Sequence, residues 1–442
     1  MDPVTIGAIS IAILVVMILI GFHVGVALAL TSFGALFLIS GKMRVAASVL
    51  EKTAHSAVME YVFAVIPLFV LMGLLTTASG ATGELFRAAE QAMRRVKGGL
   101  GIATVMANAV FAAITGVSVA SAAVFSKIAV PEMERLNYER SFSLGIVAAS
   151  SLLGMLIPPS ILMIIYGVIT EQSIGRLFAA GVVPGLLVAA MLCLAIWALV
   201  ALRPSRGGIA PEEDTGTAAI PHIKGTLWRP WPIYLLVFLV LGGIYGGFFT
   251  PTEAGAMGAL GAFLLLVMRM RFTVSGTLGI LLDTGRATAS IFLLLITAQM
   301  YSRMLTLSGL PAWVTDWAVS LDVGSGTIIL IFICILLLLG TVLDSVSILL
   351  LTMPIMFPVV TALGQDPIWF GIAAIIAIEI GLLTPPFGMV IFAMKAALPG
   401  DVRIEEIYVG TAPFLLVLLL SLGLLLAMPG LTIWLPNLIY GG

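Results

Sequence analysis

Long apolar segments separated by short polar loops run along almost the whole chain. Ten of them are candidate membrane spans: residues 4–20, 24–40, 58–78, 142–169 and 177–202, then 233–249, 254–268, 287–307, 368–397 and 413–435. A spanning helix needs roughly 20 mostly apolar residues, which most of these segments provide. Residues 203–230 are the only long polar stretch, rich in Gly, Pro and charge, and we expect them to link two halves of five spans each.

Two further apolar segments contain a small polar cluster near their middle. Residues 99–130 carry ITGVSVASA, and residues 326–360 carry LGTVLDSVS. Each arm has about 15 residues, which is shorter than the roughly 20 that a spanning helix needs. The pattern therefore predicts two re-entrant helical hairpins, each entering and leaving by the same membrane face with its tip near mid-membrane.

Two of the spans contain a double proline. IPPS begins at Ile157 and TPPFG begins at Thr384. A proline removes a backbone donor and clashes with the preceding turn, so both helices must break there. Non-helical backbone at membrane depth is tolerated only where it is buried in protein or lines a wet cavity. A double proline at matched positions therefore favours a binding site over a packing kink.

The two halves also match in sequence. GVSVAS, GMLIPPSIL and AAGVVPGLLV in the first half correspond to GTVLDS, GLLTPPFGM and YVGTAPFLLV in the second, at offsets of 224, 227 and 229 residues. Five spans are an odd number, so a duplicated unit must lie upside down relative to its copy. We therefore predict an all-α polytopic fold with an inverted repeat (residues 1–202 and 231–442), whose breaks meet at the binding site.

Composition and charge agree with a polytopic membrane protein. The 442 residues are 61% hydrophobic and only 10% charged, with a mean hydropathy of +1.19, which excludes an ordinary soluble domain. If the first hairpin opens to the cytoplasm, the loops divide the 21 basic residues 16 inside to 5 outside. This orientation puts the linker in the cytoplasm and both termini outside.

The tips and breaks supply the candidate site. We expect these residues to bind substrate and cation: Thr115, Gly116, Ser118, Ser121, Pro158, Pro159, Ser160, Gly340, Asp344, Ser345, Ser347, Thr384, Pro385, Pro386 and Gly388. Their oxygen donors suit a hard cation such as Na+, with Ser118, Ser121, Asp344, Ser345 and Thr384 as candidate ligands.

Three carboxylates have competing interpretations. Asp344 is either a cation ligand or a helix cap at the second tip, since an acid at membrane depth is functional by default. Glu379 is as consistent with a hydrogen bond between packed helices as with a transport role. Glu253 follows Thr250 and Pro251 in the pattern of a capping box and is left out of the site.

Several other functions find little support in the sequence. The three histidines have no metal-ligand spacing, the two cysteines lie in apolar runs, and no phosphate-binding loop occurs. An intramembrane aspartyl protease would need two facing aspartates, whereas only Asp344 has a suitable depth. A channel remains an alternative, separable by whether flux is saturable and coupled to a gradient. Residues 82–98 are expected to form an amphipathic helix at the inner interface.

The chain resembles the large membrane subunit (M subunit) of tripartite ATP-independent periplasmic (TRAP) transporters. The resemblance covers essentially the whole chain: FAAITGVSVASAAVFSK from Phe111, GMLIPPS from Gly154, YGGFFTPTEAGA from Tyr245, LGTVLDSVSILLLTMPIMFPV from Leu339 and GLLTPPFG from Gly381. Val117 departs from the family, which more often has a hydroxyl residue at that position of the first tip.

The resemblance implies sodium-driven, elevator-type import of an organic acid such as a C4-dicarboxylate or sialic acid, across a bacterial cytoplasmic membrane. It also implies a separate four-helix Q subunit and a periplasmic substrate-binding protein, the P subunit, with no enzyme activity, no organic cofactor and no nucleic acid. A self-contained sodium and dicarboxylate symporter is the alternative, and uptake without a binding protein would favour it.

Overall fold

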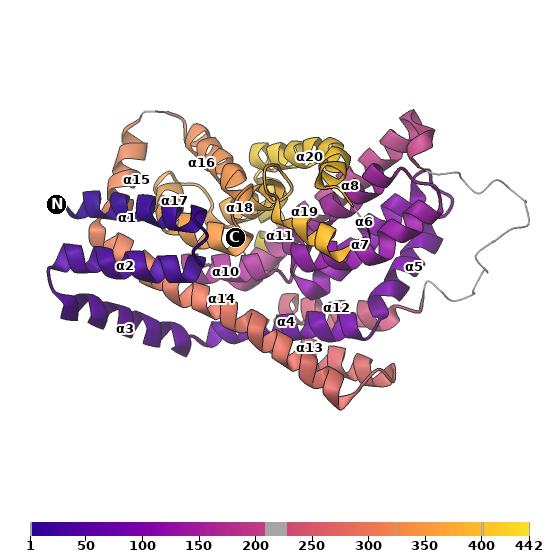
Figure 1. The fold of residues 1–442 in the computed structure, drawn as a ribbon, viewed down its shortest axis with the longest axis horizontal. Helices are drawn as coiled ribbons and strands as arrows, with labels where there is room; N and C mark the ends of the chain where they lie inside the picture. Colours follow the sequence, from indigo (N-terminus) through magenta and orange to yellow (C-terminus); the bar gives the residue numbers. More distant parts are fainter. Residues whose placement is uncertain (1, 208–227, 322, 399, 401, 442) are drawn as a thin grey trace, which may run out of the picture.

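A computed structural model describes residues 2–207, 228–321, 323–398, 400 and 402–441 (Figure 1). Within these ranges the secondary structure is helical, which confirms the expected all-α fold. Among the described residues, seven helical stretches are long and apolar enough to cross a membrane, and six shorter apolar helices accompany them. Most of the predicted linker, residues 208–227, lies outside the described residues.

One layer of helices forms around a long diagonal helix, α14 (Figure 1). α14 packs against α2, α3 and α4, while α13 packs against α4 and α12. The members of this layer are α1 (Pro3–Leu19), α2 (Val24–Ser40), α3 (Met43–Met59), η1 (Tyr61–Ala64), α4 (Val65–Ala78), α12 (Trp231–Tyr245), α13 (Pro251–Met268) and α14 (Val274–Ser308).

Small residues and a cap shape this first layer. The Glu253 carboxylate accepts the Thr250 backbone N–H at 2.8 Å, and the Glu253 N–H donates to the Thr250 hydroxyl at 3.3 Å. This capping box begins α13 at Pro251, as the sequence predicts. A methyl group added at Gly258 would lie 2.4 Å from the sulfur of Met72, so glycine allows α13 and α4 to approach closely.

A second layer contains the two predicted hairpins and the two broken helices. Each hairpin is a pair of helices joined by a short tip: α6 (Gly99–Thr115) with α7 (Ser118–Arg135), and α16 (Ser325–Gly340) with α17 (Ser345–Ala362). The other members are α5 (Ala81–Met93), α8 (Arg140–Ser151), α9 (Leu153–Leu156), α10 (Ile161–Thr170), α11 (Ile174–Leu202), α15 (Leu310–Ser320), α18 (Pro367–Gly381), α19 (Met389–Ala397), α20 (Ile404–Ala427) and α21 (Gly430–Tyr440).

The two halves contribute helices in the same order. α1 and α2 correspond to α12 and α13, and the pair α3–α4 corresponds in position and length to the single helix α14. The hairpins, broken helices and α11 of the first half then find counterparts in α16 to α20 of the second. Contacts cross between the halves: α7 packs against α19, and α17 packs against α10. Among the described residues, the helix α21 has no counterpart in the first half.

Several helices differ from the expected spans. α3 and α15 were not predicted, and α14 begins at Val274 rather than near residue 287. Asp283 and Arg286 look like a loop in sequence, but they form an ion pair at 3.3 Å on the exposed surface of α14. The expected span 413–435 is instead α20 and α21, which separate at Pro429.

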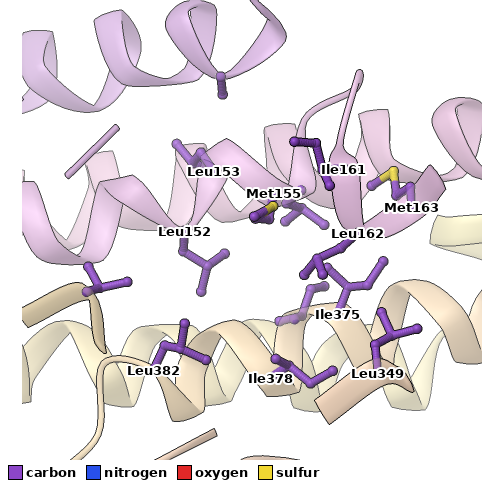
Figure 2. Packing of buried hydrophobic residues seen from close by; sticks show 14 of the residues in the cluster. Leu152, Leu153, Met155, Ile161, Leu162, Met163, Leu349, Ile375, Ile378 and Leu382 are labelled. Carbon is purple, nitrogen blue, oxygen red and sulfur yellow. The ribbon is translucent and has the colours of Figure 1, made fainter. Parts of the chain in front are cut away.

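Buried apolar side chains hold the broken helices together. Figure 2 shows Leu152 and Leu162 of the first half pointing toward Leu382 and Ile375 of the second, and all four are fully or almost fully buried. The two breaks are therefore held in one packed body.

Candidate functional site

The first hairpin tip is hydrogen-bonded to the first helix break. The Gly116 carbonyl accepts a bond from the Ile161 N–H at 3.3 Å, just after the double proline. Gly116 has a φ of +62°, and an added Cβ would lie 2.6 Å from the Pro159 carbonyl oxygen. Only glycine fits here, because the position needs both a left-handed backbone and close approach.

The second tip makes the corresponding contact with the second break. The Thr341 carbonyl accepts bonds from the Phe387 N–H at 3.2 Å and the Gly388 N–H at 3.3 Å. Gly340 and Gly381 also meet closely, since a Cβ added at Gly340 would lie 2.7 Å from the Gly381 Cα. In both halves, then, a carbonyl at the tip satisfies backbone donors that the double proline leaves free.

Most predicted hydroxyls and the Asp344 carboxylate also have local partners. The Thr115 and Thr384 hydroxyls donate to backbone carbonyls one turn earlier, at 3.1 and 2.8 Å. Ser160 caps α10 by accepting the Met163 N–H at 3.4 Å. Asp344 caps α17, because its carboxylate accepts both the backbone N–H, at 3.0 Å, and the hydroxyl of Ser347.

The two breaks differ in exposure. Pro158, Pro159 and Ser160 are buried, whereas Pro385 and Pro386 are exposed and Phe387 is 56% exposed. The Pro–Pro peptide bond is cis in both. The Tyr408 hydroxyl donates to the Phe387 carbonyl at 2.8 Å and so supports the open break from α20. The second tip and break are therefore accessible at the surface, while the first pair is enclosed.

Glu379 belongs to this site, although it is absent from the predicted set of site residues. It is 1% exposed, and the Ser345 hydroxyl donates to its Oε1 at 2.7 Å. The Ser118 hydroxyl interacts with the same carboxyl group without forming a hydrogen bond of good geometry. Ser118 and Ser345 are the first residues of α7 and α17, so one carboxylate touches the returning arm of both hairpins.

A buried polar network supports the first tip from behind. The Ser121 hydroxyl donates to the Asn108 side-chain oxygen, and the Asn108 amide donates to the Ser150 hydroxyl at 2.9 Å. All three side chains are fully buried and come from α6, α7 and α8. The structure thus places Ser121 in a network with Asn108 and Ser150. A lone asparagine in an apolar helix is the signal that could have revealed this network.

A cavity of about 1030 Å³ lies away from the tips, between the two layers. Its walls come from α3 and α14 on one side and from α10 and α17 on the other, with Tyr440 of α21 at its edge. Glu60, Glu171 and Arg303 give it charged lining, and none of the predicted site residues contributes to it.

The fold defines a multi-pass membrane protein in which each hairpin tip is bonded to the helix break of its own half. The solved structure of MtrF from Neisseria gonorrhoeae, a member of a class of antimetabolite efflux pumps, has a TM-score of 0.60 to this chain at 13% identity. The structural match covers 97% of this chain and 95% of the MtrF chain, which shows that the two proteins share a fold.

Residues 11–431 match the model of the family "Tripartite ATP-independent periplasmic transporter, DctM component", and the chain belongs to this family. It is 35% identical to the C4-dicarboxylate TRAP transporter large permease protein DctM of Pseudomonas aeruginosa, over 85% of this chain and 86% of the relative. It is 32% identical to the sialic acid TRAP transporter large permease protein SiaM of Vibrio cholerae, over 85% and 86%. The chain is therefore a transport subunit and no enzyme.

Proposed function

We propose that this chain is the transport subunit of a sodium-coupled importer that takes organic acids from a substrate-binding protein. The relatives named for a C4-dicarboxylate and for sialic acid support a carboxylate substrate. The proposed location is a bacterial cytoplasmic membrane with both termini on the periplasmic side. The distribution of basic residues between the loops supports this orientation.

The observation that carries the proposal is the matched bonding of tips and breaks. Gly116 accepts from the first break and Thr341 from the second, so each half presents a hairpin tip against a broken helix. Half-helix N-termini carry partial positive charge that attracts anions, while carbonyls at such breaks coordinate cations. One site of this kind can therefore bind an organic acid together with its coupling ion.

The proposed mechanism is an elevator built on an inverted repeat. The matched order of helices in the two halves supports the duplication. The division into two layers supports a body with both hairpins and both breaks that moves against a scaffold around α14. The cavity between α14 and the pair α10 and α17 leaves room at the boundary that such a movement would cross.

Sodium is the proposed coupling ion, with Ser118, Ser121, Asp344, Ser345 and Thr384 as candidate ligands. The Ser121, Ser345 and Thr384 hydroxyls donate their protons within the protein, but a donating hydroxyl oxygen keeps lone pairs for a cation. Hydroxyl, carboxylate and carbonyl oxygens are the donors that a hard cation prefers. Pro158, Pro159, Ser160, Pro385, Pro386 and Gly388 would shape the site through their backbone.

The proposed partners are a small four-helix Q subunit and a P subunit that delivers the substrate. The word "tripartite" in the family description supports both. The decisive experiment reconstitutes the chain in liposomes with candidate Q and P subunits and measures uptake of labelled succinate and sialic acid. We expect saturable uptake that requires an inward sodium gradient and the P subunit. Uptake without a P subunit would instead indicate a self-contained symporter, and flux that does not saturate would indicate a channel.

A further inference from the structure

Glu379 lies where the two hairpins meet, and its surroundings leave its charge uncompensated by protein. It is buried between Ser118 of α7 and Ser345 of α17. Within the described part of the chain, no Lys, Arg or His forms an ion pair with it. A buried carboxylate without a cationic partner is costly, so this group must either take up a proton or bind a cation.

Two oxygens at this position lack a well-formed hydrogen bond. Oε1 of Glu379 accepts the Ser345 hydroxyl, whereas among the described residues neither the buried Oε2 nor the buried Ser118 hydroxyl has a hydrogen bond of good geometry, although the two groups lie close together. Buried polar atoms nearly always have a partner, and an exception often marks an ion or water site. Both oxygens belong to the same contact, because Ser118 interacts with this carboxyl group.

The Glu379 carboxylate has no counterpart at the corresponding position of the first half. Glu379 precedes Gly381 by two residues, and the residue that precedes the corresponding Gly154 by two is Leu152. Ser118 and Ser345 are the first residues of α7 and α17, although the alignment of GVSVAS with GTVLDS places Ser118 opposite Val342 and Ser121 opposite Ser345. A single carboxylate therefore meets the first residue of the returning arm in both hairpins.

We propose that Glu379 is the anionic ligand of a monovalent-cation site shared by the two hairpin tips, with the Ser118 and Ser345 hydroxyls as neutral ligands. This inference rests on the proposed function, since it takes the coupling ion, Na+, as the cation. A cation held here touches the returning arm of both hairpins at once. Occupancy of the site would thus fix the tips relative to each other before the body moves.

The test measures sodium binding directly on the purified full-length chain in lipid nanodiscs. Binding of radioactive ²²Na+ gives affinity and stoichiometry, and the rise in thermal unfolding temperature with NaCl gives a second readout, with choline chloride as the ionic-strength control. We expect Glu379→Gln to lose one Na+ per chain, or to bind it more weakly by about tenfold or more, because the amide carries no charge. The matched control is Glu90→Gln, a half-buried carboxylate on α5, which should bind Na+ as the wild type does.

The outcomes separate this inference from the proposed function. Wild-type affinity and stoichiometry in Glu379→Gln would overturn the shared site while leaving sodium coupling intact. Absence of any sodium response in the wild type would overturn sodium coupling and the shared site together. If Glu379→Gln does not fold, Ser118→Ala tests the same site, because it keeps the carboxylate and removes the Ser118 hydroxyl. Unchanged sodium binding in that variant would also reject the proposal.

Discussion

Asp344 caps α17 and is also a proposed sodium ligand, and two substitutions can separate these two roles. Its carboxylate caps α17 through Ser347, and asparagine caps nearly as well as aspartate. We expect Asp344→Asn to fold normally but to need more sodium for half-maximal uptake. Asp344→Ala should in addition lose about 1 kcal/mol of stability, because it removes the cap. Sodium titrations of uptake and thermal unfolding give the two readouts, and an unchanged sodium dependence in Asp344→Asn would leave only the capping role.

Gly116 allows a sharp comparison with another glycine. Gly116 and Gly41 both end a helix with positive φ, +62° and +66°, but an added Cβ meets the Pro159 carbonyl only at Gly116. Gly41→Ala should cost about 1 kcal/mol, the usual penalty of a left-handed alanine. Gly116→Ala should cost more and reduce uptake, because it pushes the tip away from the break. Equal loss of thermal stability in the two variants would show that the close approach is unimportant.

The sequence located the helix ends and breaks around the candidate site, but it did not reveal which side chains meet there. Glycines and double prolines have fixed backbone consequences, so the tip at Gly116 and the break after Thr384 could be located. The position of Glu379 between two serines depends on how three helices pack, and no local pattern encodes that. Ser121 was proposed as a ligand, whereas its contact with Asn108 appears only when α6 and α7 are side by side.

At the scale of helices, two acidic residues on α5 should affect stability in opposite directions. The pKa of Glu90 is raised, first by burial and then by the Glu132 carboxylate of α7. Arg135 and Arg87 lower this pKa by smaller amounts. The pKa of Glu84 is lowered, mainly by its hydrogen bond to Arg269. A raised carboxyl pKa favours folding at low pH, and this advantage is lost as pH rises through the folded-state pKa. A lowered pKa has the reverse effect, with stability lost as pH falls through it.

We therefore expect Glu90→Gln to raise the thermal unfolding temperature at pH 7.5 and to change it little at about pH 3, where the acid is almost fully protonated in both states. Glu84→Gln should lower the temperature at pH 7.5, because it removes a carboxylate held 2.6 Å from the Arg269 guanidinium. The measurement is thermal unfolding in detergent across pH. A lower unfolding temperature of Glu90→Gln at pH 7.5 would contradict the raised pKa of Glu90.

The hydropathy pattern located the apolar helices and the amphipathic helix α5, but it missed α3 and α15, which carry charged residues. α3 carries Glu51, Lys52 and His55, so it does not look like a span, although its other face packs on α2 and α14. α15 follows the helix-ending Gly309 and contains Asp316, which hides it among loop residues. The hairpins and breaks were found because Gly, Pro and small polar residues interrupt otherwise apolar runs.

For the whole molecule, topology is the first expectation to test. Single cysteines at Asp2 and Leu438, both exposed, should react with a membrane-impermeant thiol reagent added from the periplasmic side. A cysteine at Arg95, also exposed, should react only after the membrane is made permeable. The reason is that two halves of five spans make ten crossings, and a re-entrant hairpin adds none. An even number of crossings returns the chain to the side where it began. Labelling of the two termini from opposite sides would contradict the inverted count.

The movement of one layer against the other can be tested with two cysteine pairs. Both pairs are built after Cys193 and Cys334 are replaced by alanine. The first pair joins Gly73 of α4 to Thr115 at the first tip, where an added Cβ on Gly73 would lie 3.2 Å from the Thr115 Cα. The second joins Phe142 of α8 to Phe414 of α20, whose rings stack at 5.8 Å inside the proposed moving body.

A short bifunctional thiol reagent should arrest uptake when it links Gly73→Cys to Thr115→Cys, because α4 belongs to the proposed scaffold and the tip must leave it during transport. The same reagent should leave uptake largely intact when it links Phe142→Cys to Phe414→Cys, because a rigid body keeps its internal distances. The first pair can also be linked directly, by a disulfide formed through mild oxidation. Reduction of that disulfide should restore uptake. Uptake that continues with the first pair linked would mean that the tip stays beside α4 throughout the cycle. The hairpin would then open and close as a gate in place, and the elevator mechanism would be wrong for this chain.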